Sequence, residues 1–241
     1  MTLKKSLLSI LCLTIGLIAS AETKVLKINK SIESIEASAG VNVIYKPTTG
    51  GNTNVAITGD AKRIDYIDIK ISGKTLEISP KRDGKNSNKR IGGVTVTVTA
   101  PIVRSVEVSS GASLKCRTSI SSSKKKISLE ASSAGKIIFS SVTASEIDIE
   151  ASSGASVTTN NLNASRIELE ASSGASIKTS TVKTDRISCE ASSAGSISIT
   201  SGQADRGNFE ASSAGSVKAS GLKVNSFSIE KSSAGSVKIS N

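Results

Sequence analysis

The sequence of 241 residues contains no histidine and no tryptophan, and only two tyrosines and three phenylalanines. Histidine is the commonest general base and metal ligand in proteins. Its absence excludes Ser-His-Asp and Cys-His catalysis and zinc sites built on imidazole. So few aromatic side chains also leave no stacking platforms of the kind that bind sugars or single-stranded bases. We therefore predict no catalytic residues, no cofactor and no metal, and a core of Ile, Val, Leu and Ala.

Long apolar runs are confined to the start of the chain. Lys4 and Lys5 precede an apolar stretch at residues 6–18, and Ala19-Ser20-Ala21 follows it. This order is typical of a cleaved secretory signal peptide, and the stretch is shorter than the roughly 20 residues that span a bilayer. We therefore expect residues 1–21 to be a signal peptide. Residues 22–241 are expected to form one exported domain in the periplasm, at the cell surface or outside the cell.

A 20-residue repeat dominates the second half of the sequence. Each copy begins with a glutamate and small residues, as in Glu150-Ala-Ser-Ser-Gly-Ala. Apolar residues such as Ile147 and Ile149 alternate with polar ones before it, which indicates a strand with one buried face. Fixed periods of this length indicate a solenoid, because they are too short for a propeller blade. Regular copies begin at Glu130, Glu150, Glu170, Glu190, Glu210 and Glu230, an earlier one at Glu107 and a fainter one at Glu36.

These features predict an all-β fold, a parallel β-helix whose coils span the 20-residue repeat. Three short strands and three turns would make up each coil. Residues 101–241 would form regular coils, and the less regular residues 22–100 would form the first coils and a cap. Removing 21 of the 241 residues leaves 220, which suffice for about eleven coils in a rod on the order of 50 Å long.

The repeat also predicts which side chains point inward. Gly202 and Gly207 replace apolar residues, so we expect a local packing defect there. Cys116 and Cys189 would lie about three coils or 15 Å apart, beyond the roughly 7 Å that a disulfide permits between Cα atoms. Both are therefore predicted to be free, buried thiols. The inward columns would be Ile147, Ile167, Ile187 and Phe227, and Ile149, Leu169, Cys189, Phe209 and Ile229.

The repeated glutamates and serines would face outward. The glutamates could form a row of cation sites or general acids, or a solvated stripe. We favour the stripe, because calcium-binding coils need further carboxylates and Gly-rich loops that are missing here. The serines would form hydroxyl ladders that hydrogen-bond between coils. The bases expected to neutralise the glutamates are Arg166, Arg186, Arg206, Lys178, Lys218 and Lys238.

Three further segments extend the pattern beyond the repeat. They are Ile35-Glu-Ala-Ser-Ala-Gly40-Val-Asn-Val43, Ile69-Lys-Ile71-Ser-Gly-Lys-Thr-Leu76-Glu-Ile78 and Val96-Thr-Val98-Thr-Ala-Pro101. In this order, followed by the Ser-Ser-Gly/Ala turns, they resemble the putative auto-transporter adhesin head GIN domain family, exported proteins common in Bacteroidetes. The resemblance implies a single-stranded right-handed parallel β-helix at the cell envelope or outside the cell. It implies no catalytic residues.

Positive charge gathers in two short segments. The chain carries 31 Lys and Arg against 20 Asp and Glu, a net charge of +11, which becomes +9 once Lys4 and Lys5 are removed. Insertions in a solenoid form loops that often bind partners. We predict that these basic segments attach to an anionic polysaccharide or another cell-surface polymer; without interleaved aromatics, a specific nucleic-acid site is not expected. Their residues are Lys81, Arg82, Lys85, Lys89 and Arg90, and Lys124, Lys125 and Lys126.

Three functions fit these observations. The first is an exported, non-enzymatic, adhesin-like binding module. The second is a structural solenoid that assembles end to end into a homo-oligomer, because exposed coil edges invite strand pairing. The third and most remote is a polysaccharide-acting enzyme, which would need clustered acids in an aromatic-lined cleft.

Overall fold

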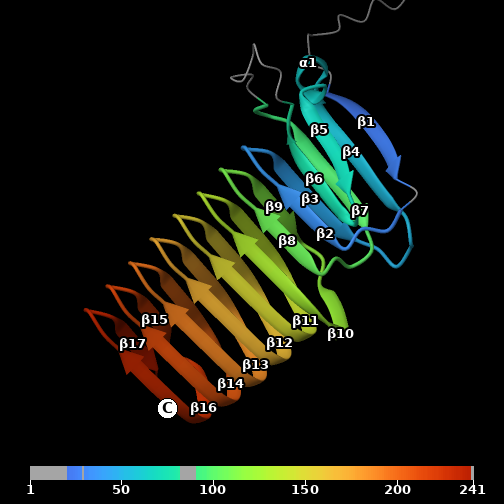
Figure 1. Ribbon diagram of the computed structural model, residues 1–241. Coiled ribbons are helices and arrows are strands. Elements are labelled where there is room, and N and C mark those ends of the chain that lie inside the picture. Colours follow the sequence, from blue (N-terminus) through green and yellow to red (C-terminus); the bar gives the residue numbers. More distant parts are fainter. Residues whose placement is uncertain (1–20, 29, 82–90, 240–241) are drawn as a thin grey trace, which may run out of the picture.

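The computed structural model describes residues 21–28, 30–81 and 91–239, apart from the side chains of residues 123 and 124. The described strands form one 17-stranded sheet, which winds into a β-solenoid of about 7 turns (Figure 1). The predicted all-β solenoid is thus confirmed. Among the described residues, no helix combines the length and the hydrophobicity that crossing a membrane requires.

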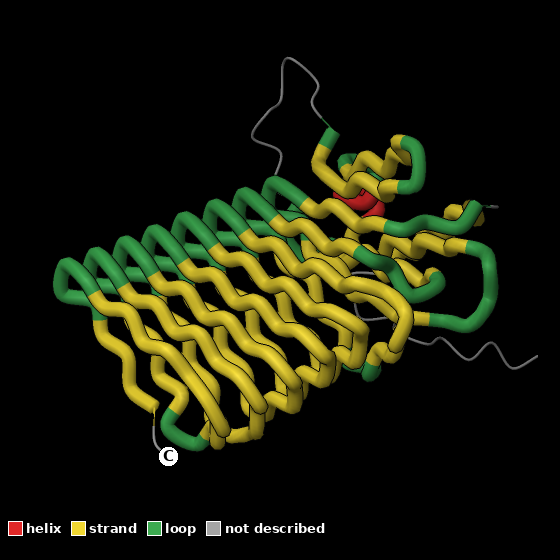
Figure 2. The backbone as a smooth tube through the Cα atoms, turned by 60° about the horizontal axis from the view of Figure 1, so that its bottom comes forward, coloured by secondary structure: helices red, strands yellow, loops and turns green. Residues whose placement is uncertain are grey.

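Parallel strands in 20-residue register build the regular part of the solenoid, whose coils lie side by side (Figure 2). Ile147 pairs with Ile167, and Ile167 with Ile187. Each 16-residue strand bends around corners of the coil while in and out positions alternate. Two of the three predicted turns are therefore bends within a strand. The strands are β10 (Ile120–Ala131), β11 (Lys136–Ala151), β12 (Ser156–Ala171), β13 (Ser176–Ala191), β14 (Ser196–Ala211), β15 (Ser216–Ala219), β16 (Leu222–Lys231) and β17 (Ser236–Ile239).

One tight turn per coil remains, at the Ser-Ser-Gly/Ala motif. Ser153 and Gly154 have φ values of 52° and 71°, and the N–H of Ala155 donates to the carbonyl of Ser152 at 3.1 Å. Two successive positive φ angles mark a type I′ turn. The N–H of Gly154 also donates to the Ser173 carbonyl, 3.0 Å away in the next coil. The predicted continuous hydroxyl ladder is wrong for the described turns, because backbone groups link successive turns. A serine of the motif does bond between coils at Ser113, whose hydroxyl donates to Asn42 Oδ1 at 2.7 Å.

The N-terminal part does not stack in chain order. Strand β2 lies between β6 and β8, and β3 lies between β7 and β9. Strands β6 and β7 therefore stack outside β2 and β3, at the N-terminal end of the solenoid, although they follow β2 and β3 in the chain. Strands β1, β4 and β5 run antiparallel to their neighbours at this end. The bounds are β1 (Ala21–Ile28), β2 (Ser34–Ala37), β3 (Asn42–Pro47), β4 (Thr53–Asp60), α1 (Ala61–Ile64), β5 (Ile67–Ser72), β6 (Thr75–Pro80), β7 (Thr95–Ala100), β8 (Ser105–Val108) and β9 (Ser113–Cys116).

This arrangement corrects one prediction and adds a feature to another. The prediction of about eleven coils is wrong, because β1, β4, β5 and α1 cover the N-terminal end without adding coils, and about 7 turns remain. The sequence assigned residues 22–100 to the first coils and a cap, but it did not indicate the order in which the coils stack. Only the pairs β2–β3 and β6–β7 continue the parallel stack, and they do so in reversed order.

The core runs through the centre of the solenoid and consists mainly of Ile, Val, Leu and Ala. Tyr45, Phe139 and Phe209 are also fully buried. The Tyr45 hydroxyl donates to the Pro101 carbonyl at 2.7 Å and accepts from the N–H of Val103 at 3.2 Å, so its polar end is satisfied.

Both predicted free thiols are buried, and neither Cys116 nor Cys189 forms a disulfide. Burial raises the pKa of Cys116 to about 11, and it raises the pKa of Cys189 further above its ordinary value. Because the thiolate is the reactive form, both side chains act as small apolar residues.

The inward columns follow the predicted register, with two differences. Phe227 and Ile229 are 39% and 38% exposed, because β16 pairs along one edge only. At Gly207, the ring of Phe209 fills the missing side chain's place: a Cβ there would lie 2.4 Å from Phe209 Cε2. The expected packing defect is therefore filled on the core side, and an outer hollow of about 320 Å³ lies over Gly207.

Candidate functional site

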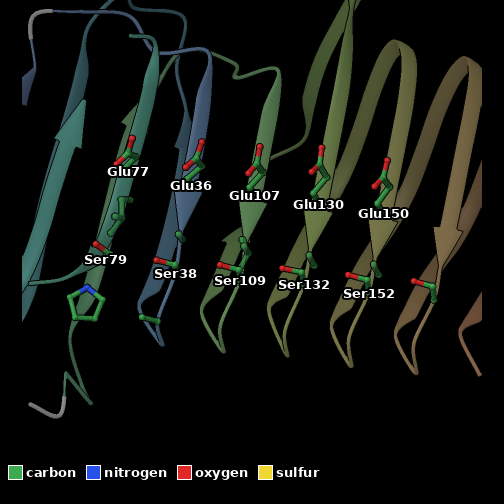
Figure 3. A pocket seen from close by; sticks show the side chains of 18 of the residues that line it. Glu36, Ser38, Glu77, Ser79, Glu107, Ser109, Glu130, Ser132, Glu150 and Ser152 are labelled. Atoms are coloured by element: carbon green, nitrogen blue, oxygen red, sulfur yellow. The ribbon is translucent and has the colours of Figure 1, made fainter. Parts of the chain in front are cut away.

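A row of glutamates runs along one outer face of the solenoid. In the coils from Glu130 to Glu210 an inward residue precedes the glutamate and an inward alanine follows it, so alternation turns the carboxylate outward. Parallel register then places each glutamate beside the next (Figure 3). The glutamate row is Glu77, Glu36, Glu107, Glu130, Glu150, Glu170, Glu190, Glu210 and Glu230.

A parallel row of serines lies two residues further along each strand, where the tight turn begins. Figure 3 shows both rows from β6 through β2 and β8 to β11. Together they line a groove of about 1210 Å³ that follows the solenoid axis from Glu77 to Glu190, and Lys81 stands among its lining residues. The serine row consists of Ser79, Ser38, Ser109, Ser132, Ser152, Ser172 and Ser192.

The carboxylates of the groove are exposed or half-buried at its surface and lie close to one another. Burial raises the pKa of Glu107, Glu150 and Glu170 above the ordinary value, and adjacent carboxylates in the row raise it further. Like charges on neighbouring strands repel. The row therefore favours a ligand that donates hydrogen bonds or carries positive charge.

The predicted neutralisation of the glutamate row by arginines is not what the structure has. Arg166 binds Glu168 instead, with Nε 3.0 Å from Oε1, and it approaches Glu146 at 3.9 Å. Lys126 pairs with Asp148 and lies 3.9 Å from Glu146. These five residues form an ion-pair cluster on neighbouring columns of the same strands.

The cluster also contains three carboxylates whose mutual spacing would allow them to hold a metal ion. Ligand oxygens of Glu146, Asp148 and Glu168 lie within 4.8 Å of one another. Lys126 and Arg166 already neutralise them, and calcium or magnesium would have to displace both bases. We therefore interpret this group as a structural ion-pair cluster.

The basic segments predicted from the sequence are only partly described. Lys81 is exposed at the groove, while Arg82, Lys85, Lys89 and Arg90 lie outside the described residues. Lys124 belongs to β10, with a side chain outside the description. Lys125 is half-buried, and Lys126 belongs to the ion-pair cluster.

Sequence reasoning missed one rung of the groove, formed by Glu77 and Ser79. The alternation Leu76-Glu77-Ile78 matches the repeat, but Pro80 follows Ser79 where the repeat has its serine and glycine turn. Only the alternation of the strand could therefore have indicated that Glu77 and Ser79 belong to the groove.

Comparison with solved structures identifies relatives of the fold. A putative adhesin from Parabacteroides distasonis has a TM-score of 0.72 at 16% identity, over 92% of this chain and 97% of that one. A putative adhesin from Bacteroides fragilis has a TM-score of 0.65 at 16% identity, over 91% and 97%. A putative lipid binding protein from Parabacteroides distasonis has a TM-score of 0.66 at 16% identity, over 92% and 97%.

A comparison with curated proteins finds no match. The sequence pattern of one family does match, over residues 32–160 and again over residues 142–241. The two matches span nearly all of the solenoid, including the groove and the arginine-bearing coils. The resemblance noted in the sequence is thus confirmed, and the chain belongs to the family described as putative auto-transporter adhesin, head GIN domain.

Proposed function

We propose that the protein is a non-enzymatic binding module of the adhesin type that holds an extended partner lengthwise in the groove. The family and the signal peptide expected at residues 1–21, nearly all of which lies outside the described residues, support a place at the cell envelope or outside the cell. One observation carries the proposal: the same glutamate and serine recur at every coil along the groove. A polymer along the axis would meet an equivalent pair of groups about every 4.8 Å.

The chemistry of the lining selects the class of partner. Ionised carboxylates only accept hydrogen bonds, and serine hydroxyls both donate and accept. A polymer rich in hydroxyl or amino groups, such as a polysaccharide, would satisfy both rows. Its donors would also relieve the repulsion that raises the pKa of Glu150 and Glu170.

Binding of isolated cell-wall polysaccharides and of a glycan array tests the proposal. We expect the double variant Glu150→Gln, Glu170→Gln to bind about tenfold or more weakly, because hydrogen bonds to charged groups contribute about 1.5–3 kcal/mol each. Glu230→Gln is the matched control, since Glu230 belongs to the same row beyond the groove. Unchanged binding by the double variant, or an equal loss in the control, would contradict the proposal.

A polysaccharide-acting enzyme is the second candidate, because clustered carboxylates in a groove are what such an enzyme requires. Two observations favour binding instead. Among the described residues, none that lines the groove is aromatic. The pKa values of Glu107, Glu150 and Glu170 all move upward, whereas an acid and a base need pKa values moved apart. We expect no release of reducing ends from any polysaccharide that binds; release abolished in the double variant would establish the enzyme.

Attachment to anionic polymers through the basic segments stays a prediction. The pairing of Lys126 with Asp148 reduces the charge that this residue offers to a partner. The variant Lys124→Gln, Lys125→Gln, Lys126→Gln should weaken retention on an anionic polymer at low salt. Retention that persists in high salt would argue against this mode of attachment.

A further inference from the structure

A second charged row lies on the same outer face of the solenoid, four residues before the glutamate row. Arg166 pairs in register with Arg186, and Arg186 with Arg206. Parallel pairing places the backbones of neighbouring arginines about 4.8 Å apart. We call these three residues the arginine row. Three like charges in line repel one another unless an anion lies between them.

The structure neutralises only the first of the three arginines. Arg166 binds Glu168, which stands two residues further along its own strand. The corresponding positions beside Arg186 and Arg206 hold Ser188 and Asn208. Among the described residues, neither Arg186 nor Arg206 forms an ion pair, and both are exposed.

The acidic residues nearest in sequence do not neutralise Arg186 and Arg206. Asp185 and Asp205 precede the two arginines, and neither pairs with them in the described structure. Asp205 instead accepts a hydrogen bond from Asn225 at 3.2 Å. The side-chain amide of Asn208 donates to Glu210 at 2.6 Å, so it points away from the arginines toward the glutamate row. The polar neighbours are therefore engaged elsewhere.

The arginine row also borders a hollow. Its volume is about 320 Å³, and Ile167, Ile187 and Gly207 contribute to its lining beside the three arginines. Partial exclusion of water from a hollow strengthens the attraction between a guanidinium group and an anion. The guanidinium fork matches the two oxygens of a carboxylate, sulfate or phosphate.

We propose that Arg186 and Arg206, with Arg166 at the edge, bind the oxyanion groups of an acidic polysaccharide laid along the solenoid. A row of like charges parallel to the axis suits acid groups that repeat along an extended chain. Single-stranded nucleic acid is disfavoured because none of the described residues that line the hollow is aromatic. This site is separate from the groove of the proposed function, and neither depends on the other.

Binding to immobilised heparin and to polygalacturonate tests the proposal, with neutral dextran as the reference. In the full chain, the variant Arg186→Gln, Arg206→Gln should bind these acidic polymers about tenfold or more weakly. The variant Lys178→Gln, Lys218→Gln removes the same charge from exposed positions on the strand segment after the tight turn. It should lose less than about threefold. Circular dichroism would verify that each variant folds.

Three further arms separate the outcomes. Arg186→Lys with Arg206→Lys keeps the charge and removes the fork, and it should give intermediate affinity. Equal losses in the arginine and lysine variants would mean that net charge alone attracts the polymer, and would overturn the proposal. So would binding that is confined to single-stranded DNA or to phosphatidylserine vesicles. The variant Glu150→Gln, Glu170→Gln removes negative charge from the same face and should bind heparin no more weakly than the native protein, so failure of the groove proposal and failure of this one give different results.

Discussion

Thr159 and Thr179 place hydroxyl groups inside the apolar core. Their relative exposures are 1% and 3%, they pair in register on β12 and β13, and neither hydroxyl has a hydrogen-bond partner. A buried hydroxyl without a partner costs about 1–3 kcal/mol. Each residue occupies a position where an isosteric valine would suit the surroundings better.

We therefore expect Thr159→Val and Thr179→Val each to raise the free energy of unfolding by about 1 kcal/mol. Urea titration followed by circular dichroism measures the change. Thr181→Val is the control, because that residue is exposed and its hydroxyl lies 3.3 Å from the Ser201 hydroxyl. A loss of stability in the two buried variants would show that their hydroxyls have partners in solution.

Gly207 and Phe209 share one volume of the core. Residue 207 pairs with Ile187, residue 209 pairs with Cys189, and the Phe209 ring lies where a side chain at residue 207 would go. Gly207→Ala should therefore destabilise the protein by about 1–3 kcal/mol through overpacking. The double variant Gly207→Ile, Phe209→Cys copies the neighbouring coil and should recover most of the loss that Gly207→Ile alone causes. A double variant less stable than Gly207→Ile would contradict the interpretation that side chains at residues 207 and 209 compete for the same space.

At the scale of elements, the glutamate row couples successive strands through their charges. The folded protein holds protons on Glu107, Glu150 and Glu170 more tightly than the unfolded chain does, because their pKa values are raised from 4.5. In the pH range above 4.5 the folded state therefore binds more protons, and its stability falls as pH rises through that range.

The thermal midpoint should accordingly decline between about pH 4.5 and neutrality through these groups. Glu150→Gln and Glu170→Gln should raise the midpoint at pH 7 and should leave it nearly unchanged at pH 4, where the native residues are protonated. Scanning calorimetry across this pH range checks the prediction. A stabilisation that is equal at both pH values would point to packing instead of charge.

At the scale of the whole molecule, each coil contacts mainly the coils beside it. Deleting residues 152–171 joins Ala151 to Ser172 and removes one repeat in register. The shortened protein should keep its strand-rich circular dichroism and unfold cooperatively at a slightly lower denaturant concentration. Deleting residues 152–161 removes half a repeat and should abolish the fold. Similar behaviour of the two deletions would contradict a solenoid built on this register.

The end formed by β16 and β17 leaves Phe227 and Ile229 exposed, and each of the two strands pairs along one edge. Assembly through this end, considered from the sequence as an end-to-end oligomer, stays a prediction. Sedimentation over a hundredfold concentration range should reveal association that Phe227→Ser weakens. A single monomeric species at every concentration would argue against it.

The repeat made the regular coils predictable, since one period determines both register and inward residues. Glu107 and Glu36 were recognised as outlying copies of the repeat, and the structure places both in the glutamate row. The position of Glu77 could not be read in the same way, because β6 pairs with a strand that precedes it in the chain by about two repeats. The groove was not predicted from the sequence, because it forms only where the glutamate row and the serine row line the same hollow. Arg186 and Arg206 were recognised as charges, but their lack of acidic partners emerges only in three dimensions.

The reversed order of the N-terminal strands has a consequence for how the chain folds as it leaves the ribosome or the export channel. Strand β2 needs β6 on one edge and β8 on the other, so Glu36 awaits partners at Glu77 and Glu107. This part of the sheet closes only when the chain has emerged as far as β9, which ends at Cys116. Each later coil pairs with the exposed edge of the coil before it. Its contacts join residues about one repeat apart in the sequence, so one further repeat is enough to extend the solenoid. The segment up to Cys116 therefore acts as the template on which the rest of the solenoid grows toward its C-terminal end.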